Sequence, residues 1–125
     1  ILMIEVKIRS NQENILSYEI NSHALINREA IIAGEAYDMV CNSVSVLSQS
    51  AIIGLDEVLK LNVNYEISDG YLSLNLDGFN GEEIEKAQVI LKTFEKSLES
   101  VILSLDEMFG IKKRKEYIIL LKEEV

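Results

Sequence analysis

Residues 61–76 read LNVNYEISDGYLSLNL, and apolar and polar side chains alternate on both sides of Asp69-Gly70. Alternation with a period of two is typical of a strand that buries one face, and Asp-Gly is a strong signal for a tight hairpin turn. The stretch therefore predicts two antiparallel strands that are joined at Ser68-Asp69-Gly70.

Three other segments also have the character of strands. Residues 3–9 and 15–20 alternate in the same way, and the polar stretch 10–14 between them predicts another hairpin. Residues 117–122 are rich in β-forming side chains, which predicts a fifth strand.

Between the two hairpins the apolar period changes to three and four, which is typical of a helix that buries one face. The apolar positions of this segment are Val40, Val44, Leu47, Ala51, Leu55 and Leu59. Asp38 is a good N-cap for such a helix, so residues 24–37 are expected to form a loop. Gly54 lies inside the helix and indicates a close contact with the backbone.

A second helix is expected between Asn80, which forms a capping box with Glu83, and Gly110, which is typical of a C-cap. Its apolar stripe has steps that alternate strictly between three and four: Ile84, Ala87, Leu91, Phe94, Leu98, Val101, Leu105 and Met108. Such regularity is compatible with a dimer seam or with helix packing inside one domain.

The element order is thus β-β-α-β-β-α-β in a single domain over residues 1–125. We expect an α/β (α+β) fold of two layers, in which both helices cover one face of a mixed or antiparallel sheet, because their stripes cannot be buried otherwise.

The chain has 125 residues and a formal net charge of −9. An acidic surface suits a basic partner. The basic cluster Lys112–Lys115 lies in a short connector, so we expect a solvated turn and no direct contact with nucleic acid. No apolar run is long enough to span a bilayer and no targeting segment is evident, so we expect no membrane contact and a cytoplasmic protein.

His23 and Cys41 are the only histidine and the only cysteine. A thiol and an imidazole are the minimum parts of a cysteine nucleophile and its base. If Cys41 lies in the first turn after Asp38, the helix N-terminus would favour the thiolate, and its N–H groups would stabilise an oxyanion. Alternatively, Cys41 is a small buried side chain and His23 a structural residue.

Two residues near Cys41 in the sequence, Asp38 and Ser45, also have two interpretations each. Asp38 either orients the imidazole or only caps the helix, and Ser45, one turn after Cys41, either donates a hydrogen bond in the site or is a small residue that permits close packing. One histidine and one cysteine do not supply the four ligands of a closed zinc site, so we expect no metal or cofactor.

These residues resemble the signature of the ribosomal-processing cysteine proteases, a family of small bacterial proteins. That signature is roughly Gly-His-Ala, a variable loop, and Asp-x-Val-Cys-Ala-Ala-Val-Ser. The chain has Ser22-His23-Ala24 and then Asp38-Met39-Val40-Cys41-Asn42-Ser43-Val44-Ser45. The element order and the Asp-Gly hairpin are also similar, so the resemblance covers nearly the whole chain. Ser22 stands where the family has glycine, and the segment between His23 and Cys41 is longer.

The resemblance implies a cysteine endopeptidase with His23 as base and Cys41 as nucleophile, while Asp38 and Ser45 match further positions of the motif. Its expected substrate is the basic N-terminal extension of large-subunit ribosomal protein twenty-seven, removed during ribosome assembly. It also implies a homodimer. Two other functions are kept as hypotheses: a non-catalytic module that binds the same ribosomal protein, and a redox or acyl-carrier thiol protein.

Overall fold

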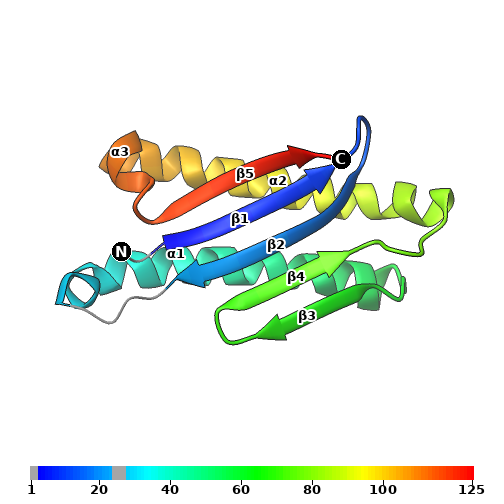
Figure 1. Cartoon of the computed structure of the whole chain (residues 1–125), viewed down its shortest axis with the longest axis horizontal. Coiled ribbons are helices and arrows are strands. Elements are labelled where there is room, and N and C mark those ends of the chain that lie inside the picture. Colours follow the sequence, from blue (N-terminus) through cyan, green and yellow to red (C-terminus); the bar gives the residue numbers. More distant parts are fainter. Residues whose placement is uncertain (1–2, 24–27) are drawn as a thin grey trace.

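The computed structural model describes the backbone of residues 3–23 and 28–125, and the side chains of residues 3–22 and 39–125. The chain folds in the order β1 (Met3–Ser10), β2 (Ile15–His23), α1 (Arg28–Ile53), η1 (Gly54–Val58), β3 (Asn64–Ser68), β4 (Tyr71–Asn75), α2 (Gly81–Phe109), α3 (Ile111–Arg114) and β5 (Ile118–Glu124) (Figure 1). This order matches the predicted one, with two short helical turns added.

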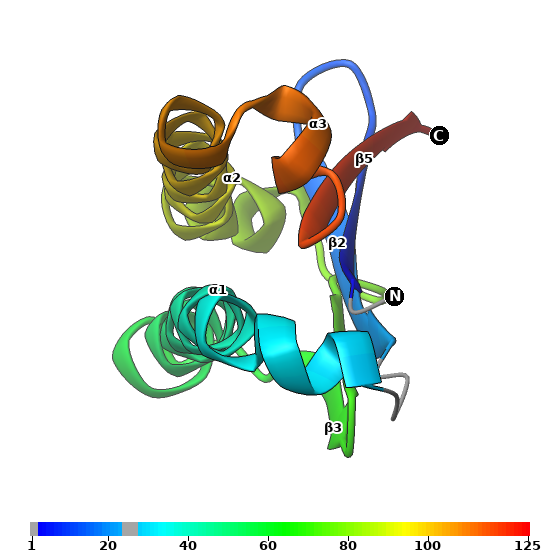
Figure 2. The same cartoon turned by 90° about the vertical axis from the view of Figure 1, so that its left-hand side faces the viewer.

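The five strands form one mixed sheet with the order β3-β4-β2-β1-β5. All neighbouring strands are antiparallel except β1 and β5, which are parallel. Figure 2 shows α1 and α2 side by side on the same face of the sheet. The predicted two-layer α+β fold is therefore confirmed.

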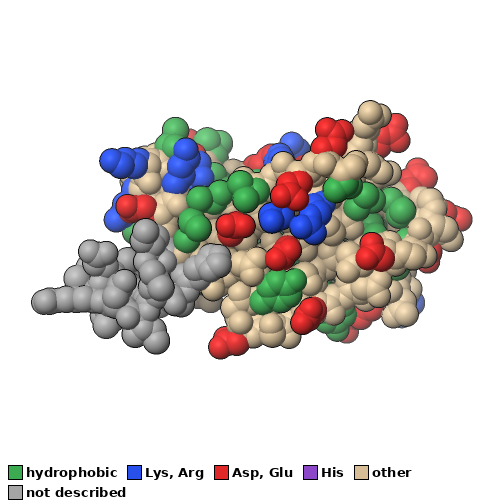
Figure 3. Space-filling model, in the orientation of Figure 1, with side chains coloured by type: hydrophobic (Ala, Val, Ile, Leu, Met, Phe, Trp, Pro, Cys, Tyr) green, Lys and Arg blue, Asp and Glu red, His purple; other side chains and the backbone are tan. Residues whose placement is uncertain are grey.

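Figure 3 looks onto the other face of the sheet, where Lys, Arg, Asp and Glu side chains are mixed over the part that is not covered by grey atoms. Lys7 and Arg9 point to this face from β1, and both contact Glu123 of β5, with N–O distances of 3.7 Å and 3.1 Å. The alternation of β1 explains this arrangement, because Val6 and Ile8 are fully buried on the helix side.

The stripe of α2 is buried inside the domain. Ala87, Leu91, Phe94, Leu98 and Leu105 are buried against the sheet and α1, and only Met108 at the end of the stripe is strongly exposed. The stripe therefore packs α2 onto the core of its own chain. The alternative interpretation as a dimer seam is wrong, because these side chains are already covered.

Both predicted ends of α2 are confirmed. The Asn80 side chain accepts a hydrogen bond from Glu83 N (2.9 Å), and the Glu83 side chain accepts one from Asn80 N (3.0 Å). Gly110 ends the helix with a φ of 85°, a value that favours glycine.

The start of α1 differs from the expectation. The helix begins at Arg28, so the predicted loop over 24–37 and the predicted N-cap at Asp38 are wrong; residues 24–27 lie outside the described part. Residues 28–38 contain alanine, glutamate and isoleucine but no proline, and a single glycine costs only about 1 kcal/mol in a helix. The helix therefore continues upstream of Asp38 even though it lacks a regular apolar stripe there.

At its other end α1 changes at Gly54 into the π-helical turn η1, closed by a hydrogen bond from Leu59 N to Gly54 O (2.9 Å). A Cβ atom at Gly54 would lie 2.8 Å from Cδ1 of Ile90. The predicted close contact at Gly54 is confirmed, and the neighbour is a side chain of α2.

The second hairpin forms as predicted, with a φ of 72° at Gly70. However, β3 begins only at Asn64, while Leu61 and Val63 are buried in the segment before it. In the described residues, none of the helices combines the length and the apolar content of a membrane span.

Candidate active site

Cys41 lies beside a pocket of about 210 Å³ between α1 and one end of the sheet. Its α1 wall repeats every three or four residues, as expected for one helix face: Cys41, Val44, Ser45, Ser48 and Gln49. The facing wall comes from four strands and the β3–β4 turn: Ile4, Ile20, Ser22, Ile67, Ser68, Gly70, Tyr71 and Leu72. The thiol thus lies at a cavity, half-buried and packed against the core.

The polar side chains of the α1 wall are held by short-range hydrogen bonds. Ser45 Oγ accepts from Gln49 Nε2 (2.7 Å), and Ser48 Oγ donates to Ser45 O (3.1 Å). The two hydroxyl groups are therefore oriented by the helix itself. Ser45, predicted as a supporting residue, is brought into the same pocket as Cys41.

Tyr18 supports this wall from the sheet. Its hydroxyl donates to Ser48 O (2.8 Å), and its ring stacks on Phe94 with 4.4 Å between the ring centroids. Burial raises the pKa of Tyr18, so the hydroxyl keeps its proton at neutral pH and remains a donor.

Ser22 connects β2 to the β3–β4 turn, because its N–H donates to Gly70 O (2.9 Å). A Cβ atom at Gly70 would lie 3.3 Å from Ser22 O, and the positive φ of Gly70 also favours glycine. In the described backbone, Lys60 is the only non-glycine residue with a positive φ. Ser22 therefore has an ordinary backbone conformation, and serine is not strained in place of the family's glycine.

His23 follows Ser22 directly as the last residue of β2, and it pairs with Met3 of β1. Its backbone is therefore adjacent to a residue that lines the Cys41 pocket. The side chains of His23 and Asp38 lie outside the described part, so a contact of either with the thiol remains a prediction.

The expected helix N-terminus at Cys41 is wrong. Because α1 begins at Arg28, Cys41 lies near its middle, where each backbone N–H donates to the carbonyl four residues earlier. The N–H groups around Cys41 are therefore not free to bind an oxyanion, and the dipole argument for a thiolate does not apply at this position.

The sequence interpretation did not include Ser48 and Gln49, although the spacing from Cys41 and Ser45 places them on the same helix face. Ser68, Gly70 and Tyr71 come from the opposite wall, and no local pattern indicates which helix they face. In the side chains described, no group of three or more His, Cys, Asp or Glu residues is arranged to hold a metal ion.

A small α+β fold with a thiol at a pocket between helix and sheet suggests a cysteine-dependent hydrolase. The model of the family described as cysteine protease Prp matches residues 3–109 of this chain. The match covers most of the sequence, and the chain belongs to the family of the cysteine protease Prp. Its class as a cysteine protease follows from this membership.

Solved structures share the fold. SMU.848 from Streptococcus mutans matches with a TM-score of 0.71 and 20% identity, over 98% of this chain and 96% of that chain. The essential ribosomal processing protease Prp from S. aureus, in complex with a substrate peptide, matches with a TM-score of 0.64 and 18% identity, over 97% and 100% of the two chains. No curated protein matches the sequence.

Proposed function

We propose that this cysteine protease removes the N-terminal extension of large-subunit ribosomal protein twenty-seven, with Cys41 as nucleophile and His23 as base. The observation that carries the proposal is the position of Cys41 at a pocket that is walled by α1 and the sheet. Family membership supports the chemistry. The substrate is supported by the S. aureus relative, which is a ribosomal processing protease in complex with a substrate peptide.

In the proposed reaction, His23 takes the proton from the Cys41 thiol, and the thiolate attacks the scissile carbonyl carbon. The tetrahedral intermediate collapses when His23 returns the proton to the leaving amine, which leaves an acyl-enzyme. A water molecule, deprotonated by His23, then attacks the thioester and releases the acid product. Ser45 is proposed to donate a hydrogen bond in this site, and Asp38 to orient the imidazole.

The direct test is cleavage of a synthetic peptide that spans the junction of the extension. We expect the native chain to cleave this peptide, Cys41→Ala to be inactive, and Ser43→Ala to retain activity, because Ser43 is exposed on α1 close to Cys41. No cleavage by the native chain, or equal cleavage by Cys41→Ala, would contradict the proposal.

A non-catalytic module that binds the same ribosomal protein is the competing function. It predicts that the peptide binds without being cleaved and that iodoacetamide alkylates Cys41 as slowly as a simple thiol. The protease instead requires alkylation to depend on pH through the imidazole, and this dependence should change in His23→Ala.

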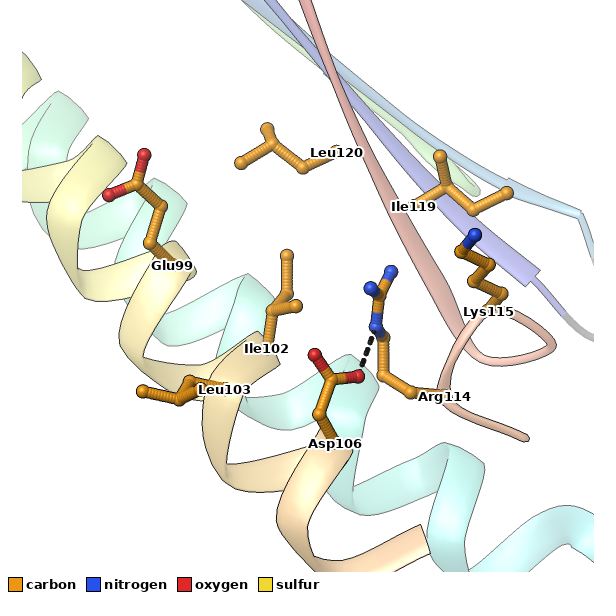
Figure 4. Close-up of a pocket in the computed structure, with 8 residues that line it drawn as sticks. All are labelled: Glu99, Ile102, Leu103, Asp106, Arg114, Lys115, Ile119 and Leu120. Atoms are coloured by element: carbon orange, nitrogen blue, oxygen red, sulfur yellow. Dashed lines mark hydrogen bonds and ion pairs between the residues drawn. The ribbon is translucent and has the colours of Figure 1, made fainter. Parts of the chain in front are cut away.

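We also propose that the protein is cytoplasmic and forms a homodimer. The α2 stripe is not available for association, but exposed apolar side chains such as Leu103 lie beside a groove of about 530 Å³ between α2 and β5. Figure 4 shows this groove, with Ile102 directed toward Leu120 and the Asp106–Arg114 ion pair at one end. Light scattering should report a dimer for the native chain and a monomer for Leu103→Asp.

A further inference from the structure

The Cys41 pocket continues into a second hollow of about 240 Å³ along α1. The two share Gln49 and Ile67, and the second hollow extends to Asp56 and Glu57 on η1. One groove therefore runs from the thiol along α1 to the acidic turn, and the edge strand β3 forms its other wall.

The middle of this groove is apolar. Tyr65 and Ile67 of β3 pair with Leu74 and Leu72 of β4, which are buried, so all four side chains are on the helix side of the sheet. Nevertheless Tyr65 and Ile67 are 49% and 53% exposed, and Ile53 on the facing helix is 50% exposed. These apolar side chains face each other across a space that the chain itself does not fill.

The far end of the groove is acidic. Asp56 is half-buried and Glu57 is exposed, and neither takes part in the ion pairs found within residues 3–22 and 39–125. Two neighbouring carboxylates without a basic partner attract a cation, and they can pair with a basic side chain of a bound peptide.

We propose that the groove binds the substrate as an extended segment, and that Asp56 and Glu57 bind a lysine or arginine side chain of that segment. Apolar side chains of the substrate would contact Ile53, Tyr65 and Ile67 on the way. This inference rests on the proposed protease function, since it assigns Cys41 to the cleavage point. The groove is continuous with the Cys41 pocket and is negatively charged at its far end, and both features favour a basic substrate segment as the bound molecule.

The spacing along α1 defines where the basic residue belongs. Asp56 follows Cys41 by fifteen residues, which corresponds to about 22 Å at a rise of about 1.5 Å per helical residue. An extended peptide advances about 3.3 Å per residue, so the basic side chain should lie roughly six or seven residues from the scissile bond.

The test uses two junction peptides that are identical except at the positions this far from the scissile bond, one on each side of it. One peptide carries lysine at these positions, and its twin carries glutamine. For the lysine peptide, Asp56→Asn/Glu57→Gln should raise KM roughly fivefold to tenfold while kcat is unchanged, because the lysine loses both of its carboxylate partners near the surface. The glutamine twin should show no change. Glu66→Gln/Glu85→Gln removes the same charge outside the groove and should behave as the native chain.

Binding to Cys41→Ala, measured by fluorescence anisotropy, separates this inference from the protease function. Suppose that the native chain cleaves neither peptide, that Cys41→Ala binds the lysine peptide more tightly than the glutamine twin, and that Asp56→Asn/Glu57→Gln removes this preference. The protease function then fails, and the groove assignment stands. If cleavage and binding are the same for both peptides and for both double variants, the groove assignment is overturned.

Discussion

The side chain of Gln88 on α2 binds both backbone polar groups of Ile15. Ile15 N donates to Gln88 Oε1 (2.6 Å), and Gln88 Nε2 donates to Ile15 O (2.9 Å) and to Ile84 O (3.0 Å). Ile15 lies where the register of β1 and β2 shifts, and such a shift disrupts the local ladder. Gln88 therefore replaces missing strand hydrogen bonds, and within residues 3–22 and 39–125 only Ser48 is also a buried polar residue.

Gln88→Leu should lower the free energy of unfolding by about 2–4 kcal/mol. The substitution introduces an apolar side chain of similar size and leaves the N–H and C=O of Ile15 buried without a partner, each at a cost of about 1–3 kcal/mol. Urea unfolding measures the change. Gln12→Leu, on the exposed loop, is the control and should shift stability by less than about 0.5 kcal/mol; equal effects of the two variants would contradict the role of Gln88.

Gly54→Ala should destabilise the native chain by about 1–3 kcal/mol, because the new methyl group would overlap Cδ1 of Ile90. Ile90→Val removes that carbon atom. In the Ile90→Val background, Gly54→Ala should therefore be neutral or stabilising, since alanine is about 1 kcal/mol better than glycine in a helix. A double-mutant cycle by thermal unfolding tests this, and additive effects would rule out the proposed contact.

Asp106→Ala should cost about 1–3 kcal/mol of stability. Arg114 Nε lies 2.7 Å from Asp106 Oδ1, and both side chains are largely buried, so the substitution leaves a partly desolvated guanidinium without its anion. By comparison, Glu82→Ala breaks only the exposed pair with Lys86, and we expect less than about 1 kcal/mol. Guanidinium unfolding of both variants distinguishes the two kinds of pair.

Tyr18 should make the protein sensitive to alkaline pH. Burial raises its pKa in the folded state, while the unfolded chain ionises near the ordinary value of about 10. The contribution of Tyr18 to the free energy of unfolding is therefore fully present below about pH 10. It is lost as the pH rises further, by up to about 1.4 kcal/mol per pH unit.

Tyr18→Phe provides the comparison. It should lose about 1 kcal/mol at neutral pH, because the hydrogen bond to Ser48 O is gone, but it should lack the alkaline decline that Tyr18 causes. Unfolding in urea between about pH 8 and about pH 11 measures both curves. Parallel curves for the two proteins would contradict this assignment.

Strict local patterns allowed the strands and α2 to be predicted. Alternation indicated the strands, and Asn80 with Glu83 marked the start of α2, because both signals depend on neighbours within a few residues. The start of α1 was predicted wrongly because aspartate is a residue type that often caps helices, whereas Asp38 lies inside the helix. Side-chain type alone does not distinguish a cap from a helical residue when the preceding turn also favours a helix.

Only one wall of the candidate site could be predicted. Cys41 and Ser45 share a helix face, which spacing reveals. Tyr71 and Gly70 reach the pocket because β4 pairs with β2, and Gln88 reaches Ile15 across the molecule. Such contacts depend on how distant segments pack, and a local pattern does not contain that information.

The parallel pairing of β1 with β5 has a consequence for the order of folding. Ile4 lies opposite Ile118, so β1 completes its hydrogen bonds only with β5, which is synthesised after both hairpins and α2. While a ribosome is still translating α2, β1 therefore has an unpaired edge, and pairing over such a long loop is slow. Until residues 118–124 emerge, the nascent chain exposes a strand edge that favours aggregation.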